Sequence, residues 1–327
     1  MPELYLPEAR TFDYDNIILV PEKCIVKSRS EVNTSVRFGK REFALPVVPA
    51  NMSTIVGEDT CVWLAERDFF YIMHRFDIDA VEFTKHLQSK GLFASISLGI
   101  KQNDYDTIER FVAEGVTPEY ITVDVAHGDS DEVYRIVREL KNRLPEAFVI
   151  AGNLATVEGA LRSVEAGADA IKVGVGPGSA CLTAPNTGFG SRGWQLSAVA
   201  NIAEAVKDYP VQIIADGGIR EYGDVAKSVT FGADMVMIGG MFAGHDENPG
   251  EVLEIDGERK KEFFGSASEF QKGEHKHVEG KKMFVQYKGS LTDTFQIIKE
   301  NVQSAVSYAG GKNLLDLRNV KYVIRNR

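Results

Sequence analysis

The feature that most constrains this chain is the repeated alternation of short apolar runs with helical patterns. The runs are rich in residues that favour β-strands, and runs apolar on both faces are typical of a buried parallel sheet. Eight strand–helix units at fairly even spacing predict an α/β fold, a single (β/α)8 TIM barrel over residues 1–327, with an open doubly wound sheet as the alternative. The expected strands are Phe43–Met52, Phe69–His74, Leu92–Gly99, Tyr120–Gly128, Phe148–Asn153, Ala170–Gly178, Val211–Ile219 and Met235–Gly244. The expected helices include Asp104–Glu114, Ser130–Leu144, Val157–Ala166, Leu196–Val206 and Gly223–Phe231.

Two intervals between these elements are too long for simple connections. One spans residues 174–194 after the sixth strand, and the other spans the polar residues 245–289 after the eighth. Long loops in compact domains are usually functional or disordered. Because both follow strands, both are expected on the carboxyl-terminal face, where barrels build their active sites. The sequence therefore predicts an active-site loop at 174–194 and a mobile flap at 245–289.

The loop at 174–183 reads Gly-Val-Gly-Pro-Gly-Ser-Ala-Cys-Leu-Thr and carries one cysteine among three glycines. Little side-chain bulk shields Cys181, and Thr183 adds a hydroxyl two residues on, so we predict a covalent nucleophile; a buried structural cysteine is the alternative. Cys24 and Cys61 are predicted to be small core residues. Three cysteines without CxxC spacing give neither a disulfide framework nor a zinc site, which favours a reducing compartment.

Glycine pairs follow two successive strands near the end of the barrel. Asp216-Gly217-Gly218 ends the seventh strand and Gly239-Gly240 ends the eighth. Barrels often build a phosphate site after their last two strands, and backbone N–H groups there favour anions. A nucleoside monophosphate fits, with its diol on Asp216 and its phosphate on the glycine turns. The alternative is that these glycines only make tight turns.

Other polar residues carry weaker signals. Asp124 ends the fourth strand and could orient a ligand, and Arg75 follows the second strand and could face the site. Glu279 could act as acid or base if the flap closes, or could be a solvated glutamate. His127 is more typical of a structural histidine. The six histidines show no HxxxH pattern, so side-chain metal ligation is not expected.

The formal net charge of −10 argues against nucleic acid or an anionic membrane as a partner. The N-terminus has no basic-then-apolar signal, and no stretch approaches a membrane span, so a cytoplasmic location is expected.

These motifs together resemble the IMP dehydrogenase/GMP reductase family over nearly the whole chain, and within it the bacterial reductase branch. The cysteine loop marks the family, while the flap and the tail mark the branch. The matching segments are residues 27–31 (Lys-Ser-Arg-Ser-Glu), 49–52 (Pro-Ala-Asn-Met), 174–183, 215–220 (Ala-Asp-Gly-Gly-Ile-Arg), 223–227 (Gly-Asp-Val-Ala-Lys), 265–273 (Gly-Ser-Ala-Ser-Glu-Phe-Gln-Lys-Gly), 278–282 (Val-Glu-Gly-Lys-Lys), 287–289 (Tyr-Lys-Gly) and 307–311 (Ser-Tyr-Ala-Gly-Gly).

Two absences favour the reductase branch. The dehydrogenases usually carry an insert of about 120 residues after the second strand, a size suited to its own core, whereas Phe76 to Leu92 here holds one short helix. Their flap also typically brings an Arg-Tyr pair to activate water, and no arginine lies between Gly265 and Gly289. A dehydrogenase without its insert and a non-enzymatic nucleotide-binding barrel are the alternatives.

The resemblance implies NADPH-dependent conversion of GMP to IMP and ammonia through a thioimidate on Cys181, in a homotetramer. It assigns Thr183 and Glu279 to proton handling. It implies that a backbone carbonyl loop at Gly176, Gly178 and Cys181 could hold a monovalent cation such as K⁺. Arg75 replaces a lysine of other members, and Lys276 replaces an arginine of animal members. The implied nucleotide-binding residues are Asp216, Gly217, Gly218, Gly239, Gly240, Gly265, Ser266, Ala267, Lys276 and Gly280. The implied cofactor-binding residues are Arg75, Asp124, Val125, Ala126, Val175 and Gly176 and, from a neighbouring subunit, Ser28, Arg29, Ser304, Ala305, Val306 and Ser307.

Overall fold

A curled parallel sheet forms the centre of the protein, in a computed structural model that describes residues 4–6, 10–265 and 280–325. Its strands are β4 (Val47–Pro49), β5 (Ser95–Leu98), β6 (Tyr120–Asp124), β7 (Phe148–Leu154), β8 (Ala170–Val173), β9 (Gln212–Asp216) and β10 (Met235–Ile238). They follow the order β4-β10-β9-β8-β7-β6-β5, and every neighbouring pair is parallel. This seven-stranded curled sheet confirms the predicted α/β fold and is consistent with a TIM-barrel-like architecture.

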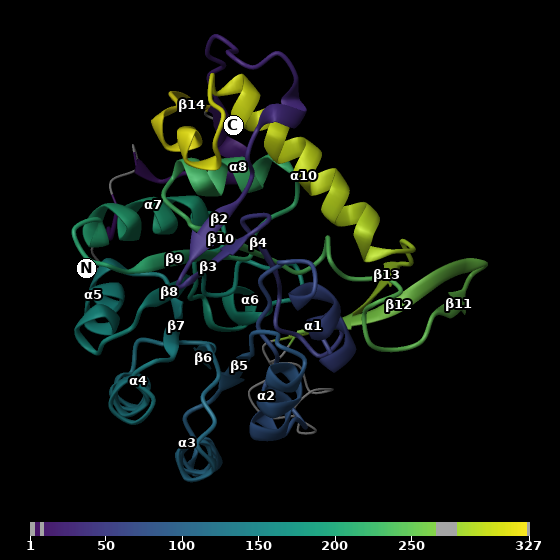
Figure 1. The fold of residues 1–327 in the computed structure, drawn as a ribbon. Coiled ribbons are helices and arrows are strands. Elements are labelled where there is room, and N and C mark those ends of the chain that lie inside the picture. The colour runs from purple at the N-terminus through teal and green to yellow at the C-terminus, as the bar shows by residue number, and fades with distance from the viewer. Residues whose placement is uncertain (1–3, 7–9, 266–279, 326–327) are drawn as a thin grey trace.

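Helices surround the sheet, as Figure 1 shows. Ser130 and Thr156 cap two of them by accepting a hydrogen bond from the backbone N–H three residues on. The predicted helices are confirmed to within two residues at each end, because their apolar residues recur at helical spacing and are buried against the sheet. The described helices are α1 (Glu58–Ala65), α2 (Ala80–Ser89), α3 (Gln102–Glu114), α4 (Asp131–Arg143), α5 (Val157–Glu165), α6 (Thr183–Thr187), α7 (Gln195–Val206), α8 (Gly223–Thr230) and α10 (Leu291–Tyr308).

The predicted strand at Phe69–His74 is not a regular strand, although Phe70 to Met73 are fully buried. Its contacts to β5 run partly through side chains: the Ser97 hydroxyl donates to the Met73 carbonyl (2.6 Å), and the Met73 N–H donates to the Ser95 carbonyl (3.1 Å). The amide of Asn51, just after β4, donates to Ser97 at 3.3 Å. Residues 69–74 therefore lie against β5 without forming a regular ladder, and one side-chain hydrogen bond joins the end of β4 to β5.

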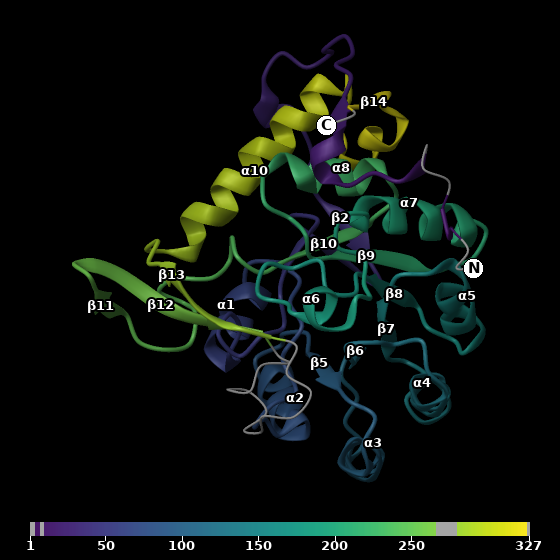
Figure 2. The same ribbon diagram turned by 180° about the vertical axis from the view of Figure 1, so that it is seen from behind.

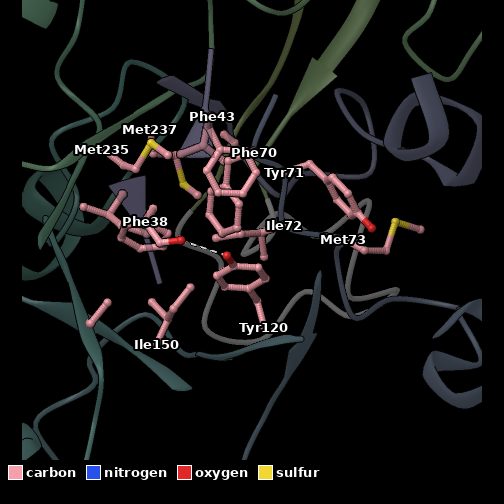
Figure 3. Close-up of a cluster of buried hydrophobic side chains, with 14 of the residues drawn as sticks. Phe38, Phe43, Phe70, Tyr71, Ile72, Met73, Tyr120, Ile150, Met235 and Met237 are labelled. Carbon is pink, nitrogen blue, oxygen red and sulfur yellow. Dashed lines mark hydrogen bonds between the residues drawn. The ribbon is translucent and has the colours of Figure 1, made fainter. Parts of the chain in front are cut away.

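An aromatic cluster fills the amino-terminal end of the sheet interior (Figure 3). The short hairpin of β2 (Val36–Phe38) and β3 (Arg41–Phe43) brings Phe38 and Phe43 against the Phe70 ring, at 5.0 and 5.1 Å between centroids. The Tyr120 hydroxyl, which would be costly to bury unpaired, donates to the Phe38 carbonyl at 2.8 Å. This packing closes one end of the sheet, so the opposite end is the one available to a ligand.

A three-stranded antiparallel sheet follows β10 and extends away from the parallel sheet in both views (Figures 1 and 2). Its strands are β11 (Leu253–Ile255), β12 (Glu258–Phe264) and β13 (Lys282–Gln286). Lys261 and Phe263 of β12 are buried while their neighbours are more exposed, which is the two-residue period of a strand. The predicted mobile flap over 245–289 is not confirmed: the described residues of this interval include an arm of regular sheet.

The two ends of the chain meet beside α8 and α10. β1 (Ile17–Leu19) pairs antiparallel with β14 (Tyr322–Ile324). Short 3-10 helices η2 (Tyr14–Asn16), η3 (Arg29–Glu31) and η4 (Leu314–Asn319) complete this region. Among the residues described, no helix has the length and apolar character needed to cross a membrane.

Candidate active site

Cys181 lies in the loop that follows β8, directly before α6. Its Sγ is 3.1 Å from the Oγ1 of Thr183, the first residue of that helix. Gly176 has φ +70°, and a Cβ there would come within 3.0 Å of the Thr183 Cβ and 3.5 Å of the thiol. Glycine at 176 therefore leaves room for the thiol and the Thr183 hydroxyl, which lie side by side.

Two buried polar side chains, Ser191 and Gln195, bind the backbone at the start of this loop. The Ser191 hydroxyl donates to the side-chain oxygen of Gln195 at 2.6 Å and accepts the N–H of Val175 at 3.0 Å. The Gln195 amide nitrogen then donates to the carbonyl of Val173 at 2.8 Å and of Asp216 at 3.3 Å. Because these bonds join the ends of β8 and β9, the loop leaves the sheet in a fixed direction.

A buried lysine lies between the two carboxylates predicted from the strand ends. The Nζ of Lys172 is 2.7 Å from Asp216 and 3.1 Å from Asp124, and its side chain is 3% exposed. Burial lowers the pKa of Lys172, but attraction to Asp216 and Asp124 outweighs burial and raises it overall. Burial raises the pKa of Asp124, but the positive charges of Lys172 and Arg75 outweigh burial, so the pKa of Asp124 lies below its ordinary value. The three groups therefore form a charged cluster at the carboxyl-terminal end of the sheet.

Asn153, the next-to-last residue of β7, completes this cluster. Its amide donates to Asp216 at 2.7 Å, on the same carboxylate oxygen that Lys172 contacts, and to the Gly174 carbonyl at 2.5 Å. One oxygen of Asp216 thus receives both contacts, which fixes the orientation of this carboxylate.

A cavity of about 430 Å³ opens over these groups. Cys181 and Thr183 line one part of it, and the turns after β9 and β10 line another, so the thiol, the carboxylates and the glycine turns share one space. The predicted residues that line the cavity are Arg75, Asp124, Val125, Ala126, Gly176, Gly178, Cys181, Thr183, Asp216, Gly217, Gly218, Gly239, Gly240, Gly265 and Gly280.

A second group of predicted residues gathers away from this cavity, on η3 and α10. The guanidinium of Arg29 donates to the Ser304 hydroxyl at 3.1 Å and to the Tyr308 hydroxyl at 3.4 Å. Val306 is fully buried, as Val175 nearly is, so neither offers its side chain to a ligand. Ser28 and Arg29 are exposed, Ser304 is half-buried and Ser307 is buried, and none of these residues lines the cavity that contains Cys181.

Four predicted site residues, Ser266, Ala267, Lys276 and Glu279, lie outside the described residues. Gly265 and Gly280 flank this segment, and the backbone of Gly280 pairs with that of Cys181. The described residues on either side of this segment, Gly265 and Gly280, both line the cavity.

The remaining predictions concern single residues and metal ligation. Cys61 is buried in α1 as expected. The prediction that Cys24 is a core residue was wrong: it is exposed, 3.3 Å from the Ser307 hydroxyl. His127 is exposed and does not line the cavity. In the described part of the chain, no three His, Cys, Asp or Glu residues gather as metal ligands would.

Lys172, Asn153 and Gln195 were missed by the sequence reasoning. A signal existed for Lys172, because a lysine in the middle of the apolar run Ala-Ile-Lys-Val must find a buried anion. Two aspartates at the ends of other parallel strands were its evident partners. Asn153 and Gln195 carried no comparable signal.

Comparison with known proteins gives a consistent result. Residues 11–326 match the family described as the IMP dehydrogenase/GMP reductase domain. A GMP reductase of Acidovorax sp. (strain JS42) is 58% identical over 313 residues, covering 96% of this chain and 95% of that protein. A GMP reductase of Staphylococcus aureus (strain N315) is 57% identical over 316 residues, covering 96% of each.

Proposed function

This chain belongs to the IMP dehydrogenase/GMP reductase family, and we infer that it catalyses the reductive deamination of GMP to IMP and ammonia with NADPH. The observation that carries this inference is the Cys181–Thr183 pair, 3.1 Å apart, in a cavity shared with Asp216 and two glycine turns. A nucleotide-binding protein without catalysis would need no such thiol. The interval between Phe76 and Leu92 holds only α2, which supports the reductase over a dehydrogenase with its regulatory insert.

The cavity suggests how GMP binds. The ribose diol would bind the Asp216 carboxylate, which Lys172 and Asn153 orient, and the phosphate would bind N–H groups of the turns at Gly217-Gly218 and Gly239-Gly240. This places the base toward Cys181. We further propose that residues 69–74 complete a closed eight-membered barrel and that the whole chain is one catalytic domain.

The chemistry proceeds on Cys181. Its thiolate adds to C2 of the purine, the C2–N bond breaks, and its electron pair leaves on the amino group, which gains a proton and departs as ammonia. Thr183, beside the sulfur, and Glu279 would handle that proton. NADPH, when bound, supplies a hydride to C2. Cys181 then leaves as thiolate, so GMP, NADPH and H⁺ yield IMP, NADP⁺ and ammonia.

The exposed cluster on η3 and α10 suits the 2′-phosphate of NADPH. Arg29 is held by Ser304 and lies over the Tyr308 ring, 5.3 Å from its centroid, so a guanidinium and hydroxyl groups converge. Because the cluster does not adjoin the cavity of its own chain, we propose that it serves a neighbouring subunit in a homotetramer. A K⁺ ion is also proposed at the carbonyls of Gly176, Gly178 and Cys181.

We expect Arg29→Ala to raise the KM for NADPH about tenfold and to leave the KM for NADH nearly unchanged, because only NADPH has the phosphate that a charge-assisted contact of this strength would hold. Initial rates against each cofactor test this. Arg37→Ala removes an exposed arginine elsewhere and is the control. An equal rise for both cofactors would contradict a 2′-phosphate contact.

The function itself is tested with two assays on the purified protein. Loss of NADPH absorbance with GMP, with IMP and ammonia as products, is the expected result. Formation of NADH from NAD⁺ and IMP without NADPH consumption on GMP would make the chain a dehydrogenase.

We expect Glu279→Gln to lower kcat by about 10²–10⁴-fold while changing the KM for GMP little, since a positioned acid or base acts mainly in the transition state. The reverse reaction, IMP with ammonia and NADP⁺, must slow as well if Glu279 handles the amine proton. Glu258→Gln on the arm is the matched control, because that carboxylate is exposed. Full kcat in both directions would show that Glu279 is only a solvated residue.

A further inference from the structure

Two lysines of the arm each bind a pair of backbone carbonyls in the segment that follows β10. The Nζ of Lys261, in β12, donates to the carbonyls of His245 (2.9 Å) and Asn248 (2.7 Å). The Nζ of Lys288, two residues after β13, donates to the carbonyls of Gly240 (2.8 Å) and Met241 (3.2 Å). Lys261 therefore anchors the base of the arm, whereas Lys288 contacts the turn at Gly239-Gly240 itself.

The ammonium of Lys288 lies behind the turn that faces the cavity. Gly239 and Gly240 line the cavity, and Lys288 does not. The Phe242 N–H donates to the Gly239 carbonyl at 3.0 Å, so the turn is tight, and the N–H of Lys288 donates to the Gly244 carbonyl at 2.8 Å, which fixes where its side chain starts. The residue as a whole is exposed, but its ammonium is partly shielded where it meets the two carbonyls, and this lowers the pKa of Lys288.

This arrangement has two physical consequences for an anion on the turn. The carbonyls bound by the ammonium fix the peptide planes that join Gly240 to Met241 and Met241 to Phe242. The Phe242 N–H is already bonded to the Gly239 carbonyl, so the N–H whose direction is fixed for an anion is that of Met241, at the end of the turn. A positive charge that touches the turn also favours an anion across it, because the intervening backbone excludes water. Both effects act on the phosphate of a nucleotide and not on its base or ribose.

We propose that Lys288 is a positioning residue for the phosphate of GMP, acting through the carbonyls of Gly240 and Met241 without touching the nucleotide. This rests on the proposed function, which puts the phosphate on the Gly239-Gly240 turn.

The test is the kinetics of Lys288→Met compared with Lys288→Arg. For Lys288→Met we expect the KM for GMP to rise about tenfold, with kcat nearly unchanged, from the loss of a charge-assisted contact. Inhibition by guanosine, which lacks the phosphate, should keep its wild-type Ki. Lys288→Arg should restore most of the GMP affinity, since it keeps the charge. Lys299→Met, exposed on α10, removes the same charge elsewhere and is the control.

The outcomes separate this inference from the function. Wild-type protein that does not turn over GMP would refute the proposed function. Wild-type turnover with an unchanged KM in Lys288→Met would refute only the inference. A parallel rise in the KM for GMP and the Ki for guanosine would also overturn it, because the lysine would then shape the whole site. A melting temperature for each variant identifies general loss of folding.

Discussion

Cys181→Ala is expected to abolish GMP turnover, with a loss of at least about 10⁴-fold in kcat, while GMP binding is retained. The thiol forms the bond to the purine, whereas Asp216 and the glycine turns hold the ribose and phosphate. Removing one sulfur from the cavity wall does not touch those contacts. The loss should therefore appear in kcat and not in the Kd for GMP measured by calorimetry.

Two measurements separate covalent catalysis from simple damage to the loop. Mass spectrometry of wild-type enzyme quenched during turnover should find a purine adduct on the peptide that contains Cys181. Cys61→Ala removes a thiol that is buried in α1 and does not line the cavity, so it should keep the adduct and nearly the wild-type rate. A near wild-type rate in Cys181→Ala would eliminate the covalent mechanism.

The fold could be predicted from the sequence where local patterns and burial agree. β6 begins at Tyr120 and β8 at Ala170, as expected, because each run is apolar on both faces. The runs were too long at their carboxyl ends, since apolar residues such as Val175 continue into loops that are also buried. A strand was predicted at residues 69–74 because the run is apolar, and an apolar run indicates burial but not strand pairing. The hydrogen bonds of the Ser97 and Tyr71 side chains, which replace part of a regular ladder, cannot be predicted from a local sequence pattern.

The site could be predicted where its reactive residues lie within short sequence motifs. Cys181 and Thr183 are two residues apart, and the glycine turns follow strands whose ends meet in any parallel sheet. Lys172 and Arg29 differ from these. The lysine itself signals a buried anion, but its position between the two aspartates depends on the strand order, in which β9 adjoins β8 and β6 lies two strands away. The contact of Arg29 with Ser304 spans 275 residues. Long-range contacts between charged groups require the topology first.

Lys172→Met is expected to lower kcat/KM for GMP by at least about 100-fold and to destabilise the protein by about 3–5 kcal/mol near pH 8, the usual effect of removing one partner from a buried ion pair. Methionine has a similar length, so the packing volume is largely kept. The variant loses the ammonium charge that lies between Asp124 and Asp216, so the two carboxylates repel each other without a positive charge between them. Asp216 would keep only the Asn153 contact on that oxygen, so the acceptor for the ribose diol would be less firmly oriented.

The pH dependence of stability gives the sharper test. In the wild type the pKa of Asp124 lies below its ordinary value, so its stabilising contribution is present above about pH 4 and is lost as the pH falls through the lowered pKa. In Lys172→Met the burial of Asp124 is no longer offset by Lys172, and its pKa should rise above the ordinary value. The folded variant then binds the extra proton, and its stability falls as the pH rises. The difference between wild type and variant should therefore grow from pH 5 to pH 8.

Urea unfolding at pH 5 and pH 8 measures this difference, with two matched variants. Lys172→Arg keeps the charge and should recover part of both stability and kcat/KM, limited by the larger guanidinium. Lys141→Met breaks the ion pair with Asp169, just before β8, whose groups are 28% and 29% exposed, so it should cost less than about 1 kcal/mol. A loss in Lys172→Met that is equal at both pH values would mean that packing, and not the charge between the two carboxylates, is what Lys172 contributes.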